Sequence, residues 1–142
     1  MHISVTRLRV RSLAYLPSFL WHSFRSTRQA RRARGFVSGR LLVNPKSVYW
    51  TLTCWESAAA MNEFRTTAAH GGAMPKLLDI CDEASVAHWT QENPELPSWQ
   101  ESHRRMAAAG RLSKVNHPSP NQRSNQFPAP QPSRLEIVLK PK

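Results

Sequence analysis

The chain has 142 residues, of which 40% are hydrophobic and 20% charged, and these values favour one folded domain over two. Eleven prolines against five glycines suggest an ordered body followed by a Pro-rich tail. No apolar run reaches the length of about 18 residues that a transmembrane helix needs. Cys54 and Cys81 are too few for a disulfide framework or a cysteine-only zinc site.

The net charge of +11 is unevenly distributed along the chain. Residues 1–50 hold ten basic and no acidic residues, residues 51–100 two basic and seven acidic ones, and residues 101–142 eight basic and two acidic ones. Such segregation is typical of a surface for nucleic acid or anionic membrane, and equally of a basic element that faces an acidic one. Because most of the basic residues are arginines, which form bidentate ion pairs, we favour the second interpretation.

The N-terminal segment resembles a secretory signal only loosely. Three arginines precede the apolar stretch 13–21, but Pro17 interrupts this stretch and a densely basic segment follows at 25–34. No cleavage site with small residues follows the stretch. We therefore expect a cytoplasmic protein.

The first half of the chain predicts three strands and one helix. Residues 3–11 alternate and are rich in β-branched side chains, which is typical of a strand. Residues 17–33 place apolar side chains at helical spacing and end before a glycine. Residues 35–43 and 48–55 predict two further strands joined by a turn at 44–46.

The next part predicts an interrupted helix and a fourth strand. Residues 58–69 predict a helix that Ser57 caps and that ends at His70, which two glycines follow. A second helical piece is expected at about 73–82, and a strand at 85–91.

The composition changes after residue 91, which we take as the boundary between a domain at 1–91 and an extension at 92–142. A short helix is expected at about 98–109. Residues 115–133 are too poor in apolar side chains to offset chain entropy by burial and predict an irregular segment. Residues 135–139 predict a terminal strand or a disordered end.

The order of the predicted elements, β-α-β-β-α-β, is that of the ferredoxin-like α+β fold, with both helices on one face of an antiparallel sheet. The strand at 48–55 carries apolar or bulky side chains on both faces, so its second face needs a cover. A second copy of the chain would supply it, which predicts a homodimeric α+β barrel. The interior of such a barrel is the expected site for a hydrophobic small molecule.

Several segments also carry a family resemblance. They are RQARRARGFVSGRLL (28–42), WTLTCWESAAAMNEFRTTAAH (50–70), AMPKL (73–77) and CDEASVAHW (81–89). Over residues 3–91 the chain resembles the antibiotic-biosynthesis-monooxygenase-like and haem-degrading-like members of the dimeric α+β barrel superfamily, and most of all small bacterial proteins related to spheroidene monooxygenase. The resemblance implies the barrel fold and, less specifically, monooxygenase activity, because one fold supports many reactions.

His70 is the sharpest single candidate, because it lies at the predicted helix break where its side chain can face a cavity. The resemblance implies haem as a cofactor, which would make His70 a candidate axial ligand and metal-binding residue. The alternative is a histidine that caps the last carbonyls of the helix. If oxygenation needs no cofactor, His70 or His88 would be the base that generates a substrate carbanion.

Other candidate site residues are aromatic or basic. Trp21, Trp50 and Trp55 would line the cavity, or would only anchor the core. Arg7 and Arg9 would hold the carboxylate of a ligand or a haem propionate. The favoured alternative is that the arginines at 7, 9 and 11 pair with the acidic residues Asp79, Asp82 and Glu83.

The function that these observations favour is that of a monooxygenase-like protein that binds a hydrophobic small molecule. A binding protein of the same fold without enzymatic activity is the alternative. Nucleic-acid binding is less favoured, because the arginines lie on a strand and a helix without a recognised binding motif.

Overall fold

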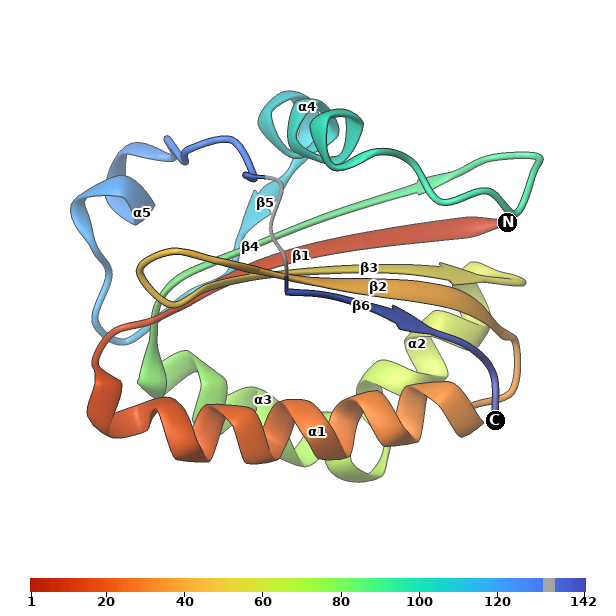
Figure 1. Ribbon diagram of the computed structural model, residues 1–142, viewed down its shortest axis with the longest axis horizontal. Helices are drawn as coiled ribbons and strands as arrows, with labels where there is room; N and C mark the ends of the chain where they lie inside the picture. Colours follow the sequence, from red (N-terminus) through yellow and green to blue (C-terminus); the bar gives the residue numbers. More distant parts are fainter. Residues whose placement is uncertain (132–134) are drawn as a thin grey trace.

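A six-stranded antiparallel sheet lies between two layers of helices (Figure 1). The computed structural model describes residues 1–131 and 135–142, except for the side chains of residues 68–71. The strands are β1 (His2–Val10), β2 (Phe36–Asn44), β3 (Val48–Trp55), β4 (Cys81–Thr90), β5 (Arg111–Leu112) and β6 (Glu136–Leu139). The helices are the 3-10 turn η1 (Leu13–Tyr15), α1 (Leu16–Arg32), α2 (Ala58–Thr66), α3 (Ala68–Ile80), α4 (Trp99–Ala109) and α5 (Pro120–Ser124).

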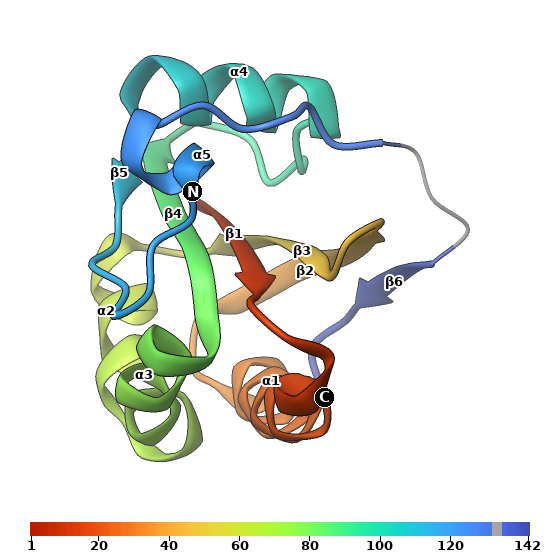
Figure 2. The same ribbon diagram turned by 90° about the vertical axis from the view of Figure 1, so that its left-hand side faces the viewer.

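The strand order is β5-β4-β1-β3-β2-β6. Its four central strands have the ferredoxin-like arrangement that the element order predicts, so this prediction of the fold is confirmed. Helices α1, α2 and α3 cover one face of the sheet, while α4 and α5 lie over the other (Figure 2). The short strands β5 and β6, both from the C-terminal extension, add one strand to each edge of the sheet.

The bend between α2 and α3 lies at Thr67, so the predicted break at His70 and the following glycines is wrong. The backbone of Thr67 is extended, with φ −112° and ψ 153°. Its hydroxyl donates to the carbonyl of Glu63 at 2.9 Å, and the side chain of Gln29 donates to the carbonyl of Thr67 at 2.8 Å. Side-chain groups thus satisfy carbonyls at the end of α2, and the helix stops there. His70 and the glycines lie inside α3.

Strand β4 begins at Cys81, four residues before the predicted start at 85. The two acidic residues that follow Cys81 form ion pairs with arginines of the neighbouring strand β1. These cross-strand pairs extend the sheet through the acidic segment. The preceding helix accordingly ends at Ile80 and does not reach 82.

The second apolar face of β3 is covered within the chain by α4. Met106 of this helix belongs to one buried cluster with the side chains of that face. The strand members of the cluster are Ile3, Val5, Leu42, Val48, Trp50, Leu52, Cys54 and Ala87. Because the extension buries this face, the two-sided pattern of β3 has an explanation other than a second copy, and the homodimer stays a prediction.

The Pro-rich part of the extension packs against β4 through polar side chains, where the composition predicts an irregular segment. Gln122 of α5 is 4% exposed and accepts a hydrogen bond from the amide of Ala84 at 3.0 Å. Its side-chain amide donates to the carbonyls of Ala84 and Ser113. Hydrogen bonds therefore provide the order that apolar burial could not.

Candidate functional site

Arg7 and Arg9 lie on the sheet face that α4 and the extension cover, because alternate residues of a strand share a face. Their register neighbours on β3 are Trp50 and Val48. On the other side lies Glu83 of β4, which pairs in register with Arg9. Three neighbouring strands therefore place basic, acidic and aromatic side chains together.

The buried carboxylate of Glu83 is the centre of this group. Nη1 of Arg7 donates to its Oε1 at 2.6 Å, Nη1 of Arg9 lies 3.2 Å from its Oε2, and the Ser119 hydroxyl donates to Oε2 at 2.7 Å. Arg9 also lies 3.4 Å from Asp82, and Nε of Arg11 donates to the backbone carbonyl of Asp79. The predicted pairing of the β1 arginines with the acidic segment is confirmed, although Arg11 bonds a carbonyl and not a carboxylate.

The pKa of Glu83 is lowered, despite the burial that on its own would raise it. Hydrogen bonds from Arg7 and Ser119 and the positive charge of Arg7 outweigh the desolvation. The carboxylate is therefore ionised at neutral pH and engaged by three donors. It acts as a counter-ion and is not available to abstract a proton from a ligand.

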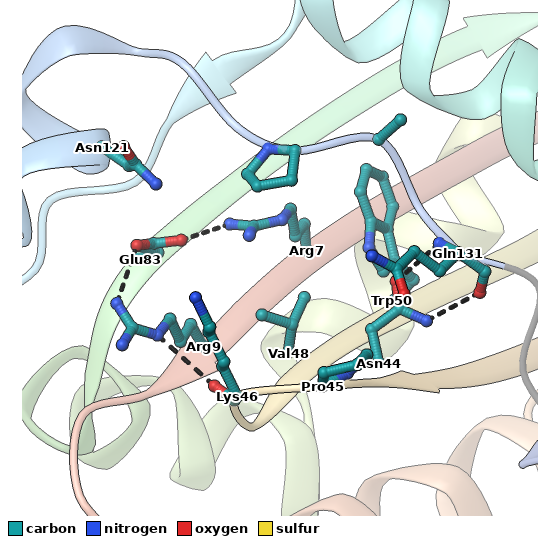
Figure 3. Close-up of a pocket in the computed structure, with 12 residues that line it drawn as sticks. Arg7, Arg9, Asn44, Pro45, Lys46, Val48, Trp50, Glu83, Asn121 and Gln131 are labelled. Carbon is teal, nitrogen blue, oxygen red and sulfur yellow. Dashed lines mark hydrogen bonds and ion pairs between the residues drawn. The ribbon is translucent and has the colours of Figure 1, made fainter.

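A cavity of about 220 Å³ opens beside these side chains, and we call it the arginine pocket (Figure 3). It is lined by Arg7, Arg9, Asn44, Pro45, Lys46, Val48, Trp50, Glu83, Asn121, Pro128, Ala129 and Gln131. Three of these residues are cationic and one is anionic, so the lining has an excess of positive charge. The pocket lies between the sheet and the C-terminal extension.

The guanidinium of Arg7 lies over two aromatic rings. Its central carbon lies 4.5 Å from the ring centroid of Phe127 and 5.9 Å from that of Trp50. Arg7 is only 3% exposed, and its Nε has no hydrogen-bond partner among the residues that the structure describes. A buried donor without a partner is costly for the fold.

Two hydrogen bonds attach the extension to the rim of the pocket. The side chain of Asn44 donates to the carbonyl of Gln131 and accepts from its amide, both at 2.9 Å. In the adjoining turn, Lys46 and Ser47 have φ angles of 65° and 60°. Left-handed backbone is uncommon for residues other than glycine and is often found at functional sites.

The other predicted site residues lie away from the arginine pocket. Trp55 is fully buried on the opposite sheet face, between Phe36 and Phe64. Trp21 is 58% exposed on the outer side of α1. The side chain of His70 lies outside the described residues, so its predicted roles as ligand and base stay predictions. A single cavity lined by Trp21, Trp50 and Trp55 together is not what the structure shows, because they lie in three separate places.

His88 lies on the sheet face that α1, α2 and α3 cover, and it stacks on His2 at 5.7 Å between ring centroids. Burial, with smaller effects of the positive charges of Arg65, His2 and Arg111, lowers the pKa of His88 to about 4. Neither ring nitrogen has a hydrogen-bond partner among the described residues. The imidazole is therefore neutral at pH 7, but it is separated from the arginine pocket by the sheet.

Haem fits neither the arginine pocket nor a second cavity of the described residues. The arginine pocket contains no histidine, cysteine, methionine or tyrosine that could ligate iron. A second cavity, between α1 and α2, also contains none of these residue types in its lining. Metal-ligand clusters of three or more side chains are likewise absent from the described part of the chain.

Sequence reasoning missed the residues contributed by the turn and the extension. Asn44 and Lys46 were recognised only as turn formers, and Ser119, Phe127 and Gln131 fall in the segment predicted to be irregular. Phe127 is the one Phe, Trp or Tyr in 115–133, and this isolation was the single available signal.

No family model and no curated protein matches the chain. Solved structures do match it. An antibiotic biosynthesis monooxygenase has a TM-score of 0.58 at 12% identity, over 66% of this chain and 100% of its own. SnoaB, a cofactor-independent oxygenase from Streptomyces nogalater, has a TM-score of 0.54 at 18% identity, over 68% and 97%. A Deinococcus radiodurans protein assigned to the antibiotic biosynthesis monooxygenases has a TM-score of 0.59 at 12% identity, over 69% and 99%. The chain therefore has the fold of the antibiotic-biosynthesis-monooxygenase-like α+β barrel proteins, as its sequence resemblance implies.

Proposed function

We propose that the chain binds a small organic anion, a carboxylate or an enolate, in the arginine pocket. The observation that carries this proposal is the excess of positive charge in the pocket lining, where Arg7, Arg9 and Lys46 stand against the one carboxylate of Glu83. An anionic oxygen would be attracted to Arg9 and Lys46 and would accept hydrogen bonds from them. Trp50 would pack against the apolar part of the ligand.

The size of the pocket limits the ligand to about one ring. Sites for drug-sized ligands have volumes of roughly 300–1,000 Å³. The arginine pocket, at about 220 Å³, is smaller. We therefore propose a compact anion in place of the hydrophobic small molecule or haem that the sequence suggested.

Oxygenation of the bound anion without a cofactor is a second candidate function. SnoaB, which shares the fold, is a cofactor-independent oxygenase. In such a reaction, an activated CH2 group and O2 give a C=O group and water, and all four electrons come from the substrate. Arg7, Arg9 and Lys46 would stabilise the enolate that reacts with O2. Glu83 is engaged as a counter-ion and cannot deprotonate the substrate. The substrate would therefore have to be acidic enough to bind as its enolate.

Titration calorimetry with benzoate tests the binding function, and benzamide is the matched neutral ligand. We expect saturable binding of benzoate and at least tenfold weaker binding of benzamide. Lys46→Gln should weaken benzoate binding, whereas Lys114→Gln, the same change at an exposed site outside the pocket, should leave it unchanged. The proposal would be overturned if benzoate and benzamide bound equally well, or if Lys46→Gln and Lys114→Gln bound benzoate equally well.

Oxygen uptake separates the two functions. Cyclohexane-1,3-dione is a single-ring compound that is an enolate anion at neutral pH, and it carries an activated CH2 group. If the chain is an oxygenase, wild type should consume O2 with this compound and Lys46→Gln should consume less. Binding of the dione without O2 consumption would eliminate the oxygenase candidate and retain the binding function.

A further inference from the structure

Four large apolar side chains are exposed together on η1 and α1. Leu13 is 75% exposed, Leu20 49%, and Trp21 and Phe24 58% each. The rings of Trp21 and Phe24 stack at 6.3 Å between centroids. We call these four residues the apolar patch. A cluster of exposed large apolar side chains on one element is a feature of interaction sites.

The apolar patch is not part of the buried face of α1. Helix α1 packs against the rest of the protein through Phe19, His22 and Ala30, which are buried. The apolar patch lies on the outward side of the same helix. In Figures 1 and 2, α1 forms the outer edge of the layer opposite α4. The arginine pocket lies on the other side of the sheet, so the two sites are independent.

A basic cluster continues the outward face of α1 toward its C-terminal end. It consists of Arg28, Arg31, Arg32 and Lys142, and positive charge from these three arginines lowers the pKa of Lys142. The C-terminal end of the chain is held there, since the amide of Lys142 donates to the carbonyl of Arg31 at 2.9 Å. Arg25 lies between the two groups, 6.0 Å from the ring of Trp21. Residues 1–50 contain no Asp or Glu. Glu63 of α2 lines one cavity together with Arg32 and offsets part of this charge.

We propose that α1 lies on the surface of an anionic lipid bilayer, with the apolar patch inserted below the headgroups and the basic cluster on their phosphates. Tryptophan and phenylalanine beside arginine are the composition of helices that lie in the membrane interface. Leu13 and Leu20 favour lipid over nucleic acid, because aliphatic side chains gain burial in lipid but do not stack on bases. A helix that lies on a membrane differs from one that spans it, and no helix of the described part is long and apolar enough to cross a membrane.

Sedimentation with vesicles tests this proposal on the full chain. Vesicles of phosphatidylcholine with phosphatidylglycerol are compared with phosphatidylcholine alone. We expect binding to the mixed vesicles and at least tenfold weaker binding to the neutral ones. Arg28→Gln and Arg32→Gln should each reduce binding about fivefold, in keeping with the usual contribution of one basic residue near an anionic surface.

The double substitution Trp21→Gln with Phe24→Gln tests the apolar patch. Both side chains are exposed, so the fold should be retained, which circular dichroism checks. Vesicle binding should fall at least tenfold, whereas the control Leu112→Gln, at an exposed leucine of β5, should bind like wild type.

Three results would overturn the proposal. The first is equal binding of the two kinds of vesicle. The second is binding of a duplex oligonucleotide that depends on Arg28 and Arg32 but not on Trp21 and Phe24, which would assign the surface to nucleic acid. The third is a dimer in light scattering that the Trp21 and Phe24 substitutions dissociate, without vesicle binding, which would assign the apolar patch to a second copy of the chain.

Discussion

Arg7 on β1 and Glu83 on β4 are separated by 76 residues in the chain, yet 2.6 Å separates Nη1 of one from Oε1 of the other. Both side chains are almost fully buried, at 3% and 1% exposure. Burying two charges is costly, and here each charge compensates the other. Both residues also line the arginine pocket.

Removal of the charge of Glu83 should strongly destabilise the fold. Glu83→Gln leaves the buried Arg7 without its counter-ion, and we expect a loss of about 3 kcal/mol or more in the free energy of unfolding. Urea unfolding followed by tryptophan fluorescence measures it. Glu101→Gln, the same substitution at a surface ion pair, should have a far smaller effect. Similar losses for the two variants would contradict the importance of the buried pair.

His88 should make the stability of the protein sensitive to mild acid. Its pKa is about 4 in the folded state and near 6.5 when unfolded, so the unfolded chain binds more protons between these values. Stability should therefore fall as the pH drops from 6.5 toward 4. At pH 5 this contribution amounts to a loss of about 2 kcal/mol relative to pH 8.

The His88→Phe variant isolates this contribution, because it removes the titrating group and retains a ring. We expect a flatter dependence of the unfolding free energy on pH between 6.5 and 5, measured by urea unfolding at each pH. His117→Phe, at an exposed histidine, serves as the control for the loss of a histidine. An unchanged slope in His88→Phe would show that other groups cause the acid sensitivity.

Asn44 should control the attachment of the extension. Asn44→Ala removes both hydrogen bonds to Gln131, and we expect a loss of about 1–3 kcal/mol in unfolding free energy. The amide of Gln131 should then exchange faster with deuterium, since its acceptor is gone. Asn62→Ala, at an exposed position of α2, should leave that exchange rate unchanged.

Lys46 should show a trade-off between stability and binding. Its left-handed backbone is unfavourable for a side chain, so Lys46→Gly should raise the unfolding free energy by about 1 kcal/mol while it weakens benzoate binding. Ser47→Gly has the same backbone relief without a loss of charge. We expect it to stabilise the protein and to bind benzoate like wild type. Equal weakening in both variants would mean that turn geometry, and not the charge of Lys46, controls binding.

The alternating and helical patterns of the first 91 residues predicted the ferredoxin-like order because those elements bury apolar side chains at regular spacing. The bend at Thr67 was missed because it depends on hydrogen bonds from Gln29, a tertiary contact that the pattern around His70 does not contain. The part of the arginine pocket that β1 contributes was predictable, since Arg7 and Arg9 share a strand face with period two. The part that the extension contributes was not, because the extension is ordered by polar contacts of Gln122 and Gln131 with distant strands, which leave no hydrophobic signal.

The most direct test of the central claim, that the arginine pocket binds a small anion, is a nitrogen-15 NMR titration of the full chain with benzoate. The account predicts saturable shifts centred on Trp50, Lys46 and Gln131, and a much smaller effect of benzamide at the same concentration. Shifts centred on Trp55 and His88 on the opposite sheet face, or none that saturate, would contradict it.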